Sequence, residues 1–132
     1  MVWRFFSSAA LVGLFVALLV GCGGSGDDDD ATPIPSSDAD VTIEVALLDT
    51  MSFEPSSITV APGEVVEVIL HNKGTLPHNF EIEGLDVDVD VKAGDTKTAI
   101  FTAPSSPGEH KIFCNVIGHE GAGMVGSFIV EQ

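Results

Sequence analysis

An alternation of apolar and polar residues, interrupted by turn signals, runs from Val41 to Val130 and constrains the fold more than any other feature of the sequence. Successive side chains of a β-strand point to opposite faces, so this alternation predicts strands with one buried face. No stretch shows a sustained helical period. Short strands at this spacing favour an all-β sandwich or barrel. The predicted strands lie at residues 41–47, 57–60, 65–70, 80–83, 87–91, 96–102, 110–114 and 125–130.

The loop between the last two predicted strands carries three residues of metal-binding type. Cys114 ends one strand, and His119 and Met124 follow it at five-residue steps. Glycines at 118, 121 and 123 allow this loop to curl tightly. His78 lies in a different loop, residues 73–79. Because a sandwich gathers its loops at its two ends, we expect the two loops to meet.

The chemistry of these four side chains favours copper. Thiolate and thioether are soft ligands suited to copper(I), and imidazole suits both oxidation states of copper. Two histidines and one cysteine with a weak axial methionine are the donors of blue copper sites. Zinc is the alternative, but a structural zinc site prefers four strong nitrogen or sulfur donors. Methionine is a weak donor, so the set fits zinc poorly.

Residues 41–132 resemble the cupredoxins, the family of small type 1 copper proteins. The resemblance covers nearly all of the chain beyond its first 40 residues. Ile117 departs from it, since loops of this length often have proline there. The matching segments are Phe53-Glu54-Pro55, Ile58-Thr59-Val60-Ala61-Pro62-Gly63-Glu64, Pro77-His78-Asn79-Phe80, and Phe113-Cys114 through His119 to Met124-Val125-Gly126.

The resemblance implies a fold, a cofactor and a set of ligands. The fold would be a Greek-key β-sandwich or barrel of about seven to eight strands, with one copper ion and no substrate turnover. His78 would be the buried histidine ligand, and His119 the ligand whose ring edge reaches the surface. Cys114 would supply the thiolate and Met124 the axial thioether. The backbone N–H of Asn79 would approach the thiolate, and its side chain would tie the two loops together.

Residues 1–21 read as an export signal rather than as part of the domain. Arg4 precedes an apolar run from Ala9 to Val20, which is shorter than the ~20 residues of a membrane-spanning helix. Leu19-Val20-Gly21-Cys22 resembles the lipobox of bacterial lipoproteins. That resemblance implies cleavage before Cys22 and lipid attachment to its thiol. An uncleaved membrane anchor is the alternative, and under either interpretation the rest of the chain is exported and stays at a membrane, facing the periplasm or the cell exterior.

The segment 22–40 reads as a lipidated, acidic linker that precedes the copper-binding domain at 41–132. It is rich in glycine, serine, proline and aspartate, and such a stretch cannot bury enough surface to fold. The chain has two cysteines. If Cys22 carries lipid, Cys114 has no disulfide partner and is reactive or metal-bound. A Cys22–Cys114 disulfide is the alternative, and it would tie the linker to the domain.

The charge of the chain narrows the class of partners. Residues 1–21 contain Arg4 and no acidic residue, so the remainder has 20 acidic and 4 basic residues, a net charge of −16. This balance argues against nucleic acid. It is compatible with basic protein partners, with a saline environment and with plain solubility.

Three functional classes remain, and a one-electron carrier between membrane-associated redox partners leads. Cytochromes or membrane oxidoreductase complexes would dock at the uncharged surface around His119. A protein for copper delivery or storage is the alternative. A copper enzyme is disfavoured, because its further copper centres need more histidines than the four present. The surface comprises Leu76, Pro77, Ile117, Gly118, Gly121, Ala122 and Gly123.

Overall fold

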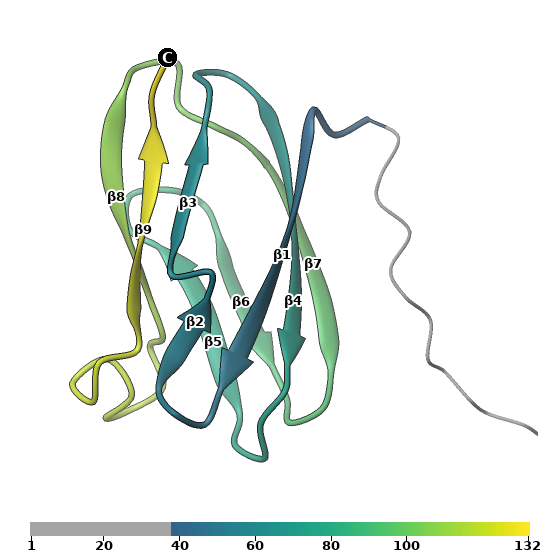
Figure 1. Ribbon diagram of the computed structural model, residues 1–132, viewed down its shortest axis with the longest axis vertical. Helices are drawn as coiled ribbons and strands as arrows, with labels where there is room; N and C mark the ends of the chain where they lie inside the picture. Colours follow the sequence, from purple (N-terminus) through teal and green to yellow (C-terminus); the bar gives the residue numbers. More distant parts are fainter. Residues whose placement is uncertain (1–37) are drawn as a thin grey trace, which may run out of the picture. The chain divides into compact units, whose positions relative to one another are not determined.

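Nine β-strands in two sheets make up the regular structure of residues 38–132, the part of the chain that this computed structural model describes (Figure 1). These residues contain no helix of the length and apolar character that a membrane span requires. The strands are β1 (Val41–Leu48), β2 (Ser52–Glu54), β3 (Ser57–Val60), β4 (Val65–Asn72), β5 (His78–Ile82), β6 (Asp88–Val91), β7 (Thr96–Thr102), β8 (Gly108–Phe113) and β9 (Val125–Val130).

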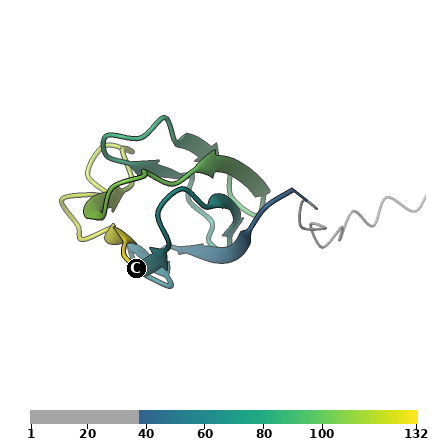
Figure 2. The same ribbon diagram turned by 90° about the horizontal axis from the view of Figure 1, so that it is seen from above.

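The two sheets have mixed strand directions. One has the order β2-β1-β4-β7 and the other the order β3-β9-β8-β5-β6. The pairs β1–β4 and β3–β9 are parallel, and the remaining pairs are antiparallel. Seen from above, the strands surround the interior that the core side chains fill (Figure 2). The predicted all-β sandwich is confirmed.

Each of the eight predicted segments forms a strand, and the ninth strand was not predicted. β2 has three residues and pairs with the end of β1, where Phe53 lies opposite Leu47. Three residues are too few to show an alternating pattern. The strand forms because β1 offers it a free edge and because Phe53, 1% exposed, anchors it in the core.

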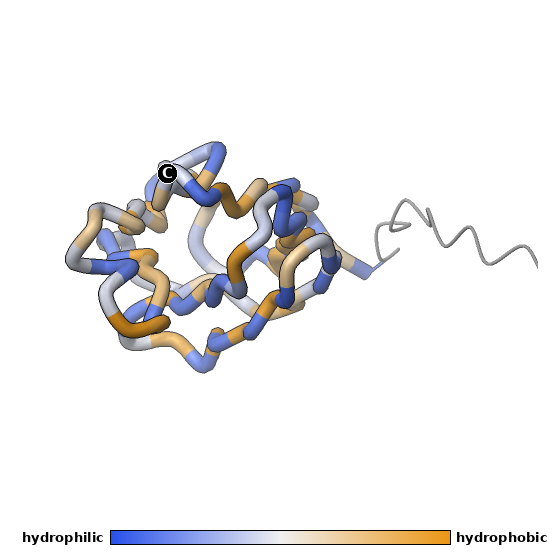
Figure 3. Tube along the Cα trace, turned by 90° about the horizontal axis from the view of Figure 1, so that it is seen from below, coloured by the Kyte–Doolittle hydropathy of each residue, from blue (hydrophilic) through white to orange (hydrophobic). Residues whose placement is uncertain are grey.

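The core lies between the sheets and follows from the alternation. Hydrophobic and hydrophilic residues succeed one another along the chain trace in Figure 3. The buried apolar side chains form one core cluster. Two aromatic contacts stand out: the rings of Phe53 and Phe80 meet edge to face at 5.6 Å, and those of Phe101 and Phe128 lie 5.5 Å apart. Burial of such rings is the main source of stability in a domain of this size.

A close backbone contact at Gly126 gives a first prediction. Gly126 pairs with Ile112, and a Cβ placed on it would collide with the backbone oxygen of Ser56. That oxygen also accepts the N–H of Ser127 at 2.9 Å, so it cannot move away freely. We expect Gly126→Ala to lower the free energy of unfolding by about 1–3 kcal/mol, measured by urea unfolding of the metal-free protein.

Gly108 provides the matched control for this prediction. It lies on the neighbouring strand β8, and a Cβ placed on it meets no atom within 4 Å. Gly108→Ala should therefore change the free energy of unfolding by no more than about 0.5 kcal/mol. Equal urea midpoints for the two variants would contradict the close contact at Gly126.

Candidate metal centre

Strand pairing brings His78 and Cys114 to the same end of one sheet. β5 begins at His78 and β8 ends next to Cys114. The two strands are antiparallel neighbours, with Glu81 opposite Phe113, so the start of β5 lies beside the end of β8. His78, predicted in a loop but found at the start of β5 because it pairs with Val91, therefore meets the loop after Cys114 at the lower end of the sandwich in Figure 1.

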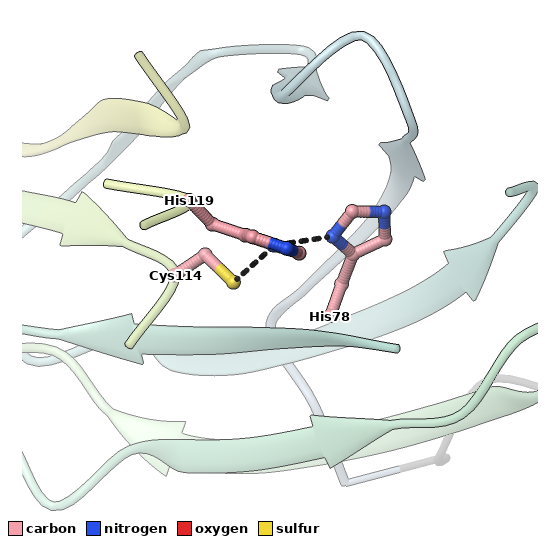
Figure 4. A group of neighbouring side chains, drawn as sticks. All are labelled: His78, Cys114 and His119. Carbon is pink, nitrogen blue, oxygen red and sulfur yellow. Dashed lines mark hydrogen bonds between the residues drawn. The ribbon is translucent and has the colours of Figure 1, made fainter. Parts of the chain in front are cut away.

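Three donor atoms converge at this end. The Nδ1 atoms of His78 and His119 are 3.2 Å apart, and the Sγ of Cys114 lies 3.5 Å from Nδ1 of His119. All three donors lie within 4.8 Å of one another. Figure 4 shows the three side chains pointing toward a common centre. Donors at about 2.0–2.3 Å from one ion, at tetrahedral or trigonal angles, are roughly 3.3–3.8 Å apart. The observed spacing thus fits a metal ion.

Burial distinguishes the donors. The side chains of Cys114 and Met124 are fully buried, and His78 is 1% exposed. His119 is only partly buried. A metal ion bound at such a site would favour the thiolate form of the cysteine, which is the form that binds metals.

The loop after Cys114 is closed by backbone hydrogen bonds around its histidine. The N–H of Met124 donates to the carbonyl of His119 at 3.0 Å, and the N–H of Cys114 donates to the carbonyl of Met124 at 3.2 Å. Gly118 and Gly123 adopt φ values of 88° and 105°, a region that favours glycine. These turns place the Met124 backbone against both neighbouring candidate ligands.

Asn79, the second residue of β5, links this strand to Cys114 and to the loop that follows it. Its backbone N–H donates to Sγ of Cys114 at 3.2 Å, and its side-chain oxygen accepts the N–H of Asn115 at 3.4 Å. Its Nδ2 donates to the carboxylates of Asp88 at 2.7 Å and Asp90 at 3.1 Å. Asn79 is fully buried, so each polar atom needs such a partner. Hydrogen bonds of this kind orient a sulfur ligand and tune its metal.

Asp49 is a contact of the site that the sequence reasoning missed. Its Oδ1 lies 3.3 Å from Nε2 of His78, on the ring edge opposite the donor Nδ1. The backbone N–H of Thr75, followed by its hydroxyl, lowers the pKa of Asp49 to about 2. Burial is the main cause that lowers the pKa of His78, and the bond to Asp49 opposes it. The two residues are 29 positions apart, so no local motif signals the contact.

The predicted site residues fall into two groups: those that the structure describes, and those that lie outside residues 38–132. His78, Cys114 and His119 are brought together, and Met124 is buried beside them. Cys22, with the predicted signal at 1–21 and most of the linker at 22–40, lies outside residues 38–132.

Comparisons with known proteins agree with the fold. Residues 11–130 match a family model described as the cupredoxin-like domain. The copper-resistant cuproprotein CopI of Vibrio cholerae is 30% identical over 129 residues, covering 80% of this chain and 74% of the relative. The plastocyanin of Nostoc punctiforme is 29% identical over 95 residues, covering 61% of this chain and 66% of the relative.

Among solved structures, a reduced auracyanin from Roseiflexus castenholzii is similar, with a TM-score of 0.64 over 71% of this chain and 99% of the other. At 23% identity this similarity concerns the fold alone. The family model, by contrast, spans nearly the whole chain, from the apolar N-terminal run to the last strand. The chain therefore belongs to the cupredoxin-like domain family.

Proposed function

We propose that the protein is a one-electron carrier in which His78, Cys114, His119 and Met124 hold one copper ion as a type 1 site. The single observation that carries this proposal is the convergence of one thiol sulfur and two imidazole nitrogens within 4.8 Å. The donor types suit both oxidation states of copper. The similarity to a plastocyanin supports the same interpretation.

Different residues of the site provide the different properties that such a carrier needs. Copper, when bound, supplies the change between its +2 and +1 states. His78 and Cys114 are held by paired strands and by Asn79, so their positions should change little when the charge of the centre changes. A site that rearranges little has a low barrier to electron exchange. His119 is the partly exposed donor, so an electron partner approaches most closely at its ring.

The surface around His119 suits a transient redox partner. Its most exposed apolar side chains are Ile117, 99% exposed, and Leu76, 41% exposed. Weak electron-transfer complexes use small interfaces of this kind. Exposed acidic residues at 83, 86 and 88 would steer a basic partner toward the domain, an attraction that salt weakens. The partner we propose is a cytochrome or a membrane oxidoreductase complex.

Attachment to a membrane would keep the carrier near such partners. We propose lipid attachment at Cys22 after removal of residues 1–21, with the domain facing the periplasm or the cell exterior. One lipid chain gives marginal binding, and a second chain makes the attachment stable. The acidic linker would hold the domain away from the bilayer surface.

Copper delivery or storage is the second candidate, and the similarity to a copper-resistant cuproprotein favours it. A delivery protein must release its ion readily, whereas the donors here are enclosed: two of the three are buried. A copper enzyme has less support. The two other histidines bond elsewhere, His71 to Thr96 and His110 to the carbonyl of Glu83, and residues 38–132 hold one cluster of potential ligands.

Addition of copper(II) to the purified protein tests the proposal. We expect an intense blue or green colour that ascorbate bleaches and an oxidant restores, with one copper per chain. A colourless complex that a copper(I) chelator empties within the mixing time would instead support delivery. Sustained turnover with oxygen or nitrite would indicate an enzyme and contradict the carrier.

A further inference from the structure

Asp49 joins two turns at the metal end of the sandwich. It follows β1 directly, and its carboxylate reaches across to the loop between β4 and β5. Oδ2 accepts the N–H and the hydroxyl of Thr75, each at 2.8 Å. Oδ1 accepts the N–H of Leu76 at 3.2 Å and lies 3.3 Å from Nε2 of His78. One carboxylate therefore holds both the loop and the ring of a candidate ligand.

The sequence around this contact leaves room for the carboxylate. A Cβ on Gly74 would collide with the side chain of Asp49, so glycine lets the loop approach it. The Oδ1 atom of Asp49 lies 3.3 Å from Nε2 of His78. Within residues 38–132, no lysine or arginine lies close enough to neutralise the carboxylate as an ion pair, and its side chain is 36% exposed. The full negative charge thus faces the ring of His78.

A carboxylate next to Nε2 determines which ring nitrogen of His78 keeps a lone pair that can bind a metal ion. A neutral imidazole carries its proton on one nitrogen and a lone pair on the other, and the partner of one nitrogen fixes the state of the second. An ionised carboxylate only accepts hydrogen bonds, so Nε2 must carry the proton. The lone pair then lies on Nδ1, which faces His119 and Cys114.

We propose that Asp49 is a positioning residue for the copper centre, fixing the Nε2–H form of His78 and favouring copper(II) over copper(I) through its charge. The proposal rests on the function proposed above. A carboxylate behind a histidine ligand raises the basicity of that ligand. A nearby negative charge also stabilises the ion of higher charge more than the ion of lower charge. Both effects lower the reduction potential.

Two variants separate this role from simple anchoring of the loop. Asp49→Asn removes the charge and keeps the size of the side chain. Thr75→Val is the matched control, because it removes one hydrogen bond to the same carboxylate and leaves the contact with His78 in place. Thermal unfolding of both metal-free variants checks that each one folds.

The first measurement is the reduction potential of the copper-loaded proteins. We expect Asp49→Asn to lower the ratio of copper(II) affinity to copper(I) affinity about tenfold, which raises the potential by about 59 mV. Thr75→Val should leave the ratio unchanged within about twofold. An unchanged potential in Asp49→Asn, or an equal rise in Thr75→Val, would overturn the proposal, since the latter result means that loop anchoring alone sets the potential.

The second measurement needs no copper and so separates this inference from the function. Long-range ¹H–¹⁵N spectra of the metal-free protein, recorded above the usual histidine pKa of about 6.5, report which nitrogen of each ring carries the proton. We expect His78 to be protonated at Nε2 in the parent and in Thr75→Val, and to show a mixture of both forms in Asp49→Ala. A pure Nε2–H form in Asp49→Ala would refute the positioning role even in a working carrier. If the parent binds no coloured copper, the carrier proposal fails, and these spectra still decide the role of Asp49.

Discussion

Replacing Cys114 by serine is expected to abolish both the intense colour of the copper(II) form and its reversible bleaching by ascorbate. The side chain is fully buried and lies 3.5 Å from Nδ1 of His119. Serine keeps the shape of the side chain but offers a hydroxyl that stays protonated and is a hard donor. We expect the affinity for copper(I) to fall by more than about 100-fold, beyond the range that changes in outer-shell partners produce.

The other cysteine of the chain is the matched control for this variant. Cys22→Ser makes the same chemical change at the position that we propose for lipid attachment, so colour and redox cycling should persist. Unfolding of the metal-free Cys114→Ser protein establishes whether it folds, and the N–H of Asn79 retains an oxygen acceptor there. Colour and cycling that survive in a folded Cys114→Ser protein would refute the type 1 site.

The sequence predicted the fold well wherever strands are long enough to show their period. β1 has eight residues and β7 has seven, and both form within one residue of the predicted bounds. β5 begins two residues earlier than predicted, at His78, because its pairing with β6 places His78 opposite Val91. β2 escaped prediction because its pairing with β1 is a long-range property that three residues cannot encode.

The residues of the metal centre also differ in whether the sequence could predict their place in the site. His78, Cys114, His119 and Met124 were predicted as ligands from residue type, spacing and a family resemblance, and the structure brings the donor atoms of the first three together. The parallel pairing of β1 with β4 was not predicted, and it is what places the turn after β1 beside the loop after β4. Asp49 reaches His78 only through that pairing. The contact of Asp49 with His78 therefore lay beyond the sequence reasoning, because it depends on a strand pairing that no local motif signals.

Phe80→Ala is expected to cause the largest loss of stability in the domain. Phe80 is fully buried, and its ring meets that of Phe53 edge to face at 5.6 Å. Removing a buried phenylalanine ring costs about 3–5 kcal/mol, a large part of the roughly 5–15 kcal/mol that stabilises a typical domain. Urea unfolding of the metal-free protein should show this loss.

Ile100→Ala, at a side chain that is 55% exposed, should change stability by no more than about 0.5 kcal/mol. Comparable losses in the two variants would contradict the core assigned to Phe80.

The same variant tests whether the core supports the metal centre. Phe80 follows His78 by two residues on β5, so both side chains lie on the inner face of that strand. Copper binds the folded form and raises stability by an amount that depends on its affinity.

If the cavity left by Phe80 stays local, copper should raise the unfolding midpoint of Phe80→Ala as much as that of the parent. If the ring of Phe80 also braces His78, the gain on adding copper should be smaller in Phe80→Ala. Because β5 is held on both sides by β6 and β8, and His78 is tied to Asp49, we expect equal gains. A smaller gain in Phe80→Ala would show that packing behind β5, rather than strand pairing, holds the ligand in place.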